Sequence, residues 1–343
     1  MRCVEARDMD DHALVIGGTR FIGRHTVEEF LAHDYEVTVF NRGNHDNPFA
    51  DTEAVSHQQG DRTDDADLSE AAALDPDVVI DCVAYKPREV RTATRVFDDV
   101  DAYVYISSGS AYGDEEIPKR EGETRLCECT DEQAVDDSPE SYGPRKAEGD
   151  RAVFAAAERG VNAMSVRPCI VYGPHDYTAR TDYWIDRVLN HERVLVPGDG
   201  SNIWHRVSVS AVAEALRVVA ENGEPGEAYN VGDRRMLTLG ETVELISETL
   251  AEAGVDDADI EVVTAGEREL ASAGIEMEEF PLYRSYPHVL STAKLADLGW
   301  DPISVEEGYR RAVEDHLDSD RTGRENGPDR EDTERVLGVL DTL

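Results

Sequence analysis

The feature that most constrains the fold is a glycine-rich turn near the N-terminus. The apolar run Ala13–Ile16 is followed directly by Gly17-Gly18-Thr19-Arg20-Phe21-Ile22-Gly23, where a helical pattern begins. A strand, a glycine turn and a helix in this order are typical of the phosphate-binding unit of a doubly wound α/β sheet. The glycines let the backbone approach a pyrophosphate, and the helix N–H groups stabilise its charge. A tight turn without a ligand is the alternative.

Short apolar runs alternate with longer periodic segments through the first half of the chain, which is typical of a parallel sheet built from β-α-β units. Strands are predicted near 13–17, 36–40, 54–58, 77–82, 102–107 and 162–166, and helices near 22–33, 66–73, 88–98 and 141–159. The pattern predicts a Rossmann-type doubly wound parallel sheet, and we assign it to a dinucleotide-binding domain over residues 1–168.

The pattern of predicted strands and helices changes after Pro168. Helices are predicted near 179–190, 210–222, 239–253 and 304–317, with shorter strands near 194–196, 228–231 and 259–263. We interpret residues 169–317 as a smaller α/β substrate-binding lobe. Residues 318–343 are acidic and are predicted to form a loose tail.

Charge narrows the possible partners. The chain has 74 acidic and 34 basic residues, a net charge of −40, and its only lysines are Lys86, Lys119, Lys146 and Lys294. Such a field repels phosphate backbones, so no nucleic-acid partner is expected. Acid excess with lysine depletion indicates adaptation to molar salt, where the Debye length is about 3 Å and surface carboxylates repel one another little. An ordinary acidic protein would leave the lysine depletion unexplained.

Other features point to a cytoplasmic protein without a metal. The five cysteines, Cys3 among them, lack the spacing of a disulfide framework, and Cys127 and Cys129 have no second ligand pair nearby. No apolar run approaches the roughly 18 residues of a membrane span. Residues 1–12 are charged where a secretion signal would be apolar.

Two arginines bear on which dinucleotide would bind. Asn41 and Arg42 follow the second predicted strand, where an acid would bind the ribose 2′-hydroxyl of NAD and an arginine can pair with a 2′-phosphate. Arg42 and Arg20 therefore favour NADP, although an exposed arginine in an acidic chain can also serve only to balance charge. Asp61, after the third strand, is a candidate adenine contact or a solvated loop carboxylate.

Three side chains are candidates for catalysis. Tyr142 and Lys146 stand four residues apart at the start of the predicted helix 141–159, so they share one face. A nearby ammonium lowers the pKa of tyrosine from about 10 and lets it act as a base. Ser108, or Ser110 as second choice, lies at the end of the fifth strand, where ligands bind in such sheets. A surface pair and a hydroxyl-rich turn are the alternatives.

These motifs resemble the extended short-chain dehydrogenase/reductase family, in particular its NAD(P)-dependent epimerase/dehydratase group acting on nucleotide sugars. The similarity runs from about Ala13 to Asp315. It includes Arg167-Pro168-Cys169-Ile170-Val171-Tyr172-Gly173-Pro174, Ala228-Tyr229-Asn230-Val231-Gly232 and Ser291–Trp300.

The resemblance implies a role for each candidate. Tyr142 would be the base, Lys146 would lower its pKa and hold the nicotinamide ribose, and Ser108 would bond the reacting oxygen. Ala84 and Pro168, in segments aligned with family motifs, are further candidate cofactor contacts. The resemblance also implies a homodimer through the helices near 88–98 and 141–159.

Departures from the family pattern limit the substrate. Dehydratases of the family carry an Asp-Glu pair after the Ser/Thr position, where this chain has Gly109-Ser110, so 4,6-dehydration is disfavoured. Cys82-Val83-Ala84-Tyr85 replaces the usual Asn-x-Ala-Ala. The segment 204–211 lacks the usual arginine and paired aspartate, and Arg206 or Arg180 is the candidate phosphate contact in its place.

We therefore expect an NAD(P)-dependent epimerase or oxidoreductase that acts by tyrosine-assisted hydride transfer on a sugar, with a nucleotide sugar as the expected substrate. The alternative is a catalytically degenerate relative that binds RNA or senses NAD(P). The glycine turn with Arg20 at its centre is similar to a subgroup that includes chloroplast stem-loop RNA-binding proteins, but the chain shows no basic stripe with aromatics.

Overall fold

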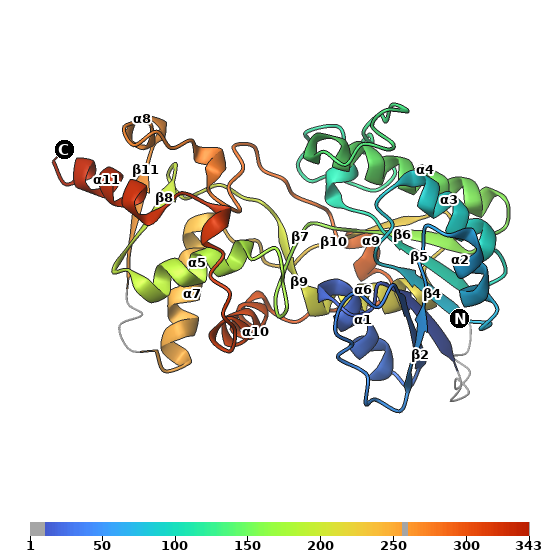
Figure 1. Cartoon of the computed structure of the whole chain (residues 1–343). Helices are drawn as coiled ribbons and strands as arrows, with labels where there is room; N and C mark the ends of the chain where they lie inside the picture. The colour runs from blue at the N-terminus through green and yellow to red at the C-terminus, as the bar shows by residue number, and fades with distance from the viewer. Residues whose placement is uncertain (1–10, 256–259, 343) are drawn as a thin grey trace.

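Within residues 11–255 and 260–342, which the computed structural model describes, seven parallel strands form one central sheet in the order β10-β6-β5-β4-β1-β2-β3 (Figure 1). The strands are β1 (His12–Ile16), β2 (Glu36–Asn41), β3 (Val55–Gln59), β4 (Val78–Asp81), β5 (Ala102–Ile106), β6 (Ala163–Pro168) and β10 (Ala228–Val231). The order reverses between β1 and β4, which opens a crevice at their carboxyl ends. This is the predicted Rossmann-type fold.

Helices cover both faces of the sheet. One face carries α2 (Asp65–Ala72), α3 (Pro87–Val96) and α4 (Tyr142–Glu158), and the other carries α1 (Phe21–Leu31) and α6 (Val209–Asn222). Side chains alternate along β1, so Leu14 packs under α2 to α4 while Val15 packs under α1 and α6. Both residues are fully buried. The strand is therefore apolar on both sides, as parallel strands covered by helices are.

A second lobe lies beside the sheet (Figure 1). It contains two small parallel pairs, β8 (Arg193–Pro197) with β11 (Glu261–Ala265) and β7 (Ile170–Tyr172) with β9 (Arg206–Ser208). Its helices are α5 (Arg180–Asn190), α7 (Leu239–Glu252), α8 (Glu267–Ala271), α10 (Val305–Leu317) and α11 (Arg330–Leu340), and α9 (Ala293–Ala296) returns to the sheet. Trp184 and Tyr309 are buried in the separate core of this lobe.

Every predicted strand and helix lies within two residues of an observed one, but two larger predictions were wrong. The segment 169–317 is not one lobe, because β10 pairs with β6 in the central sheet and α6 packs on that sheet. The reason is that the apolar face of α6, including Val212 and Leu216, fits the sheet face beside α1. Cys3 and residue 259 of the predicted strand 259–263 lie outside the described residues.

The C-terminal segment is not a loose tail. Residues 330–340 form α11, whose Val336 and Leu337 are buried in the core of the second lobe. The short 3₁₀ turn Arg324–Asn326 is tied to α5, because Arg324 donates two hydrogen bonds to Asp186 at 2.9 Å. Two buried apolar residues in this otherwise charged helix pack on the lobe core, and the acidic composition of the segment gave no indication of them. No helix in the described part of the chain is long and apolar enough to cross a membrane.

Candidate active site

The glycine turn has the geometry that the sequence pattern requires. Gly17 has a φ of +92°, and a Cβ there would lie 2.5 Å from Cγ1 of Val83. A Cβ on Gly23 would overlap the carbonyl oxygen of Gly17, so the start of α1 packs directly on the turn. No side chain caps the first turn of α1, and no acidic residue lies in it. Its N–H groups therefore remain available to an anion, which a dinucleotide pyrophosphate supplies.

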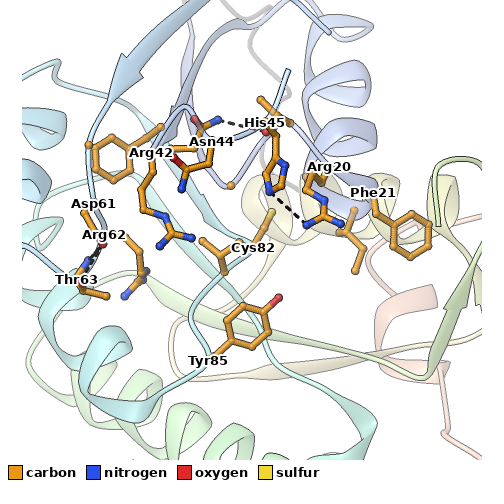
Figure 2. Close-up of a pocket in the computed structure, with 18 of the residues that line it drawn as sticks. Arg20, Phe21, Arg42, Asn44, His45, Asp61, Arg62, Thr63, Cys82 and Tyr85 are labelled. Atoms are coloured by element: carbon orange, nitrogen blue, oxygen red, sulfur yellow. Dashed lines mark hydrogen bonds between the residues drawn. The ribbon is translucent and has the colours of Figure 1, made fainter. Parts of the chain in front are cut away.

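A pocket of about 390 Å³ lies beside this turn, at the carboxyl ends of β1, β2 and β4 (Figure 2). Among the predicted cofactor residues, those that line it are Gly17, Thr19, Arg20, Phe21, Ile22, Gly23, Asn41, Arg42 and Asp61. Gly18, Ala84, Lys146 and Pro168 do not. A Cβ on Gly18 would meet valine side chains of the core instead, which explains the small residue there.

Arginines and aromatic rings gather around the pocket. Arg20 stacks its guanidinium on the ring of Tyr177, 3.9 Å from the ring centre, and lies 3.4 Å from Nε2 of His45. Phe21 packs edge-on against the same tyrosine. Arg42 is exposed, and no carboxylate of the described residues lies within ion-pair distance of it. Figure 2 shows the guanidinium of Arg42 extending toward the centre of the pocket.

Arg62 is a pocket residue that sequence reasoning missed. Its side chain is only 9% exposed and forms an ion pair with Asp81, which also accepts a hydrogen bond from Tyr103 at 2.8 Å. Although burial opposes the charge, Asp81 raises the pKa of the guanidinium. The Nε and Nη1 atoms of Arg62 have no hydrogen-bond partner, and the nearest carboxylate to Nη1 is that of Glu89, at 4.0 Å. Buried donors are rarely left unpaired, so a polar ligand in the pocket is the natural partner. The signal available in the sequence was its place directly after Asp61.

The predicted catalytic side chains converge where β5 and α4 meet. Ser108 follows β5 and is 9% exposed, and its hydroxyl acts to lower the pKa of Tyr142 at the start of α4. Lys146, one turn further along α4, is 3% exposed, and its ammonium lies 5.9 Å from the ring centre of Tyr142. It donates to the carbonyl oxygens of Ala84 at 2.9 Å and Ile106 at 2.7 Å. The loop of Ala84 is therefore joined to α4.

The electrostatics differ from the predicted pattern. Burial raises the pKa of Tyr142, and the hydrogen bond with Ser108 and the charge of Arg180 offset only part of that rise. The expected lowering of the pKa of Tyr142 is therefore not met in the protein without a ligand, and Lys146 is not among the groups that act on this pKa most strongly. Burial also lowers the pKa of Lys146 to about 8, against the attraction of Asp81 and Asp150. Desolvation outweighs pair interactions at both groups.

Two further residues connect the pocket to Tyr142. Tyr85 lines the pocket, its ring centre lies 5.2 Å from the Lys146 ammonium, and Tyr177 contributes to the rise of its pKa. Arg180 begins α5, and its charge acts on the phenol of Tyr142. Arg206, the other candidate phosphate contact, is instead buried and donates to Leu237 and Thr242.

The cysteines and acidic side chains of the described residues do not form a metal site. Cys82 lines the pocket, whereas Cys127 and Cys129 lie elsewhere, and in the described part of the chain no three His, Cys, Asp or Glu side chains are grouped to hold an ion.

Comparisons with known proteins agree with this geometry. The chain matches the model of the NAD dependent epimerase/dehydratase family over residues 13–232. It is 29% identical to the chloroplast stem-loop binding protein of 41 kDa b of Arabidopsis thaliana, over 66% of this chain and 60% of that protein. It is 26% identical to the low-salt glycan biosynthesis protein Agl12 of Haloferax volcanii, over 90% of this chain and 99% of that protein.

A solved structure has the same fold. The dTDP-glucose 4,6-dehydratase from Bacillus anthracis, in complex with NAD, aligns with a TM-score of 0.69 and 21% identity over 90% of this chain and 97% of that chain. Because the family model covers well over half of its length, the chain belongs to the NAD dependent epimerase/dehydratase family. This is a family of nicotinamide-dependent oxidoreductases and isomerases, as the sequence motifs predict.

Proposed function

We propose that this protein is an NAD(P)-dependent epimerase or oxidoreductase that transfers hydride to and from a carbon of a nucleotide sugar, with Tyr142 handling the proton. The observation that carries the proposal is the grouping of Tyr142 with the hydroxyl of Ser108, which acts on its pKa, and with the buried ammonium of Lys146. The group stands at the carboxyl edge of the sheet, next to the glycine-turn pocket.

The pocket fits a nicotinamide dinucleotide. Gly17 and Gly23 leave room that a Cβ would fill, and the uncapped first turn of α1 faces the same place. The unpartnered donors of Arg62 would meet a polar group at the adenosine end. We favour NADP over NAD, because the exposed Arg42 is free to pair with a 2′-phosphate, and Arg20 can exchange its stacking on Tyr177 for a phosphate contact.

The chain's own residues account for the proton. The phenol of Tyr142 is protonated at neutral pH, since burial raises its pKa. It can therefore donate a proton to a substrate carbonyl oxygen while Ser108 hydrogen-bonds the same oxygen. In the opposite direction, the charge of Arg180 stabilises the phenolate that accepts the proton of a substrate hydroxyl, and the ammonium of Lys146 lies 5.9 Å from the centre of the same ring. A bound nicotinamide would supply the hydride donor or acceptor.

The substrate class rests on the relatives and on one departure. Similar proteins include a dTDP-D-glucose 4,6-dehydratase of Mus musculus and a putative UDP-glucose 4-epimerase of Methanocaldococcus jannaschii. Gly109 and Ser110 carry no acid and base for the loss of water, so we propose epimerisation or carbonyl reduction rather than dehydration. Arg180 is the proposed contact for the nucleotide phosphates.

The test is cofactor binding followed by turnover, in about 2 M KCl to screen the acidic surface. NAD, NADP and their reduced forms are compared by nicotinamide fluorescence, and UDP- and dTDP-sugars are then screened for interconversion. Tyr142→Phe should bind cofactor like the parent chain and lose about 10²–10⁴-fold in rate. Full turnover by Tyr142→Phe would refute the role of Tyr142, and a folded chain that binds none of the cofactors would refute the proposal.

A binding function is the second candidate, because one relative is named as a stem-loop binding protein. The net charge of −40 opposes it. Tight RNA binding that persists in molar KCl, without sugar turnover, would favour this candidate instead.

We also propose that the chain acts in the cytoplasm as a homodimer through α3 and α4, which pack side by side (Figure 1). Sedimentation in molar KCl tests the dimer. A monomer at micromolar concentration would exclude it.

A further inference from the structure

The pocket beside the glycine turn does not extend to the proposed catalytic side chains. Of the described residues that line it, none is Ser108, Tyr142 or Lys146. Arg20 lies at the end of the pocket opposite Asp61 (Figure 2). Hydride transfer beside Tyr142 requires an open passage from the pocket to this phenol, and in this structure the passage is closed.

Two tyrosine rings lie where the pocket ends. Tyr85 and Tyr177 both line the pocket, and they are 45% and 52% exposed. The ammonium of Lys146 lies 5.2 Å from the ring centre of Tyr85 and 5.9 Å from that of Tyr142, so these two rings are neighbours. Burial raises the pKa of Tyr142 most, and Tyr177 adds to this rise, so Tyr177 is close to the same phenol. Both rings therefore stand between the pocket and Tyr142.

The backbone fixes the place of Tyr85. Its N–H donates to the carboxylate of Glu89, in the first turn of α3, at 2.8 Å. The carbonyl oxygen of the preceding residue, Ala84, accepts from the ammonium of Lys146 at 2.9 Å. This loop is thus tied to both α3 and α4, and Tyr85 forms the fixed side of the closed end.

By contrast, side-chain contacts with the glycine turn hold the ring of Tyr177. The guanidinium of Arg20 lies 3.9 Å from its ring centre, and the ring of Phe21 packs on it edge-on, with the ring centres 6.3 Å apart. The same turn leads into the uncapped first turn of α1, where an anion would bind. An anion there competes with Tyr177 for Arg20, because a guanidinium binds a phosphate more strongly than an aromatic ring.

The loop that carries Tyr177 has an anchored backbone. On either side of it, His175 and Ala179 have φ values of +63° and +52°, which are uncommon for residues other than glycine. The N–H of His175 donates to Asp315 at 2.9 Å, and the carbonyl of Ala179 accepts from the N–H of Tyr183 at 3.2 Å. Both flanks are therefore held to helices of the second lobe, and movement of Tyr177 is a rotation of its exposed side chain.

We propose that Tyr177 is a positioning residue for the cofactor: Arg20 holds its ring across the passage to Tyr142, and a pyrophosphate that binds Arg20 releases the ring and opens the passage. The inference rests on the proposed function, since it needs a nicotinamide dinucleotide in this pocket. The adenosine diphosphate part of the cofactor would then control access for the nicotinamide part. Without an anion at the glycine turn, the ring of Tyr177 shields Tyr142 from the pocket.

Two fragments of the cofactor separate the two events. ADP carries the adenosine and the pyrophosphate, and dihydronicotinamide riboside, which is fluorescent, carries the reduced nicotinamide and its ribose. The dissociation constant of the riboside is measured by fluorescence with and without saturating ADP, in about 2 M KCl. The parent chain is compared with Tyr177→Ala and Tyr177→Phe. The matched control is Tyr286→Ala, because Tyr286 is 45% exposed and is not among the described residues that line the pocket.

In the parent chain, ADP should tighten binding of the riboside roughly fivefold to tenfold, as expected when one cation–π contact and one aromatic contact no longer favour the closed state. Tyr177→Ala should bind the riboside without ADP as tightly as the parent chain does with ADP, and ADP should then have little effect. Tyr177→Phe keeps the ring and should keep the coupling. Tyr286→Ala should behave like the parent chain.

Binding of the riboside that ADP does not affect in the parent chain, or that ADP tightens equally in Tyr177→Ala, would overturn the inference while the proposed hydride transfer stands. Failure of the proposed function gives a different result, namely a folded parent chain that binds neither NADH nor NADPH. If the riboside binds too weakly to measure in every chain, the affinity for ADP decides. Tyr177→Ala frees Arg20 and should bind ADP roughly fivefold to tenfold more tightly than the parent chain and Tyr177→Phe. An unchanged or weaker affinity of Tyr177→Ala for ADP would overturn the inference.

Discussion

The variant Lys146→Met distinguishes the contribution of the buried ammonium to turnover from its contribution to the stability of the fold. The pKa of Lys146 is lowered to about 8 from 10.5, which corresponds to about 3 kcal/mol against the charged form in the folded state. Removing the charge recovers that amount. It also leaves the carbonyls of Ala84 and Ile106 without their donor, at about 1–3 kcal/mol each. The two effects nearly cancel, so the variant should stay within about 3 kcal/mol of the parent stability.

The pH dependence carries a definite sign. Between pH 8 and 10.5 the unfolded chain still binds the Lys146 proton while the folded chain has lost it. The free energy of unfolding of the parent chain therefore rises with pH across this window, relative to that of Lys146→Met. Tyrosines also titrate near this range, but they are common to both chains and their contributions cancel in the difference.

The assay is urea unfolding of both chains at pH 7, 8, 9 and 10 in molar KCl, with hydride transfer measured at pH 7. Lys86→Met is the matched control, because Lys86 is 34% exposed and pairs with Asp137 on the surface. Turnover by Lys146→Met should fall at least about 100-fold. A loss of stability above about 5 kcal/mol at pH 7, or a difference between the two chains that does not change with pH, would refute the reasoning.

Three further predictions follow from other parts of the structure. Arg62→Met should lower the free energy of unfolding by about 3–5 kcal/mol, because it leaves the charge of the buried Asp81 without its cation. The double variant Arg62→Met with Asp81→Asn should recover most of that loss. Additive losses in the double variant would contradict the pairing. Leu337→Ala should destabilise the chain by about 2–3 kcal/mol in urea unfolding, because this side chain is buried, whereas a loose tail would give no change. The preference for NADP over NAD should fall as KCl rises from about 0.5 to 3 M, because Arg42 is exposed to screening. If the preference of the parent chain does not depend on salt but is lost in Arg42→Ala, the 2′-phosphate binds where salt does not screen it, and this prediction is refuted.

Local signals made the first half of the fold predictable from the sequence. The glycine turn depends on contacts within a few residues, such as Gly23 against Gly17, and the spacing of Tyr142 and Lys146 is fixed by one helical turn. Parallel strands covered on both faces are continuous apolar runs, so their positions could be read directly. These features need no knowledge of distant contacts.

The features that were missed all depend on distant contacts. Pairing of β10 with β6 joins segments more than sixty residues apart, and nothing local distinguishes β10 from a strand of the second lobe. The buried partner of Arg62 is Asp81, at the end of another strand. The pKa of Tyr142 could not be predicted, because it depends on burial and on Ser108 and Arg180, which come from distant parts of the chain.

The charge of the chain gives burial a particular importance at this site. In molar salt an exposed cation is screened within about 3 Å, so a surface lysine or arginine attracts a ligand only at contact. Lys146 and Arg62 are 3% and 9% exposed, respectively, where mobile ions cannot follow and the effective dielectric is low. Their electrostatic effect on a ligand therefore persists at salt concentrations that screen the exposed charges of the surface. Backbone carbonyls hold Lys146 in place, and the carboxylate of Asp81 holds Arg62. At this site, groups of the protein therefore take the place of dissolved counterions. Two of the chain's four lysines, Lys119 and Lys146, are buried where screening does not reach.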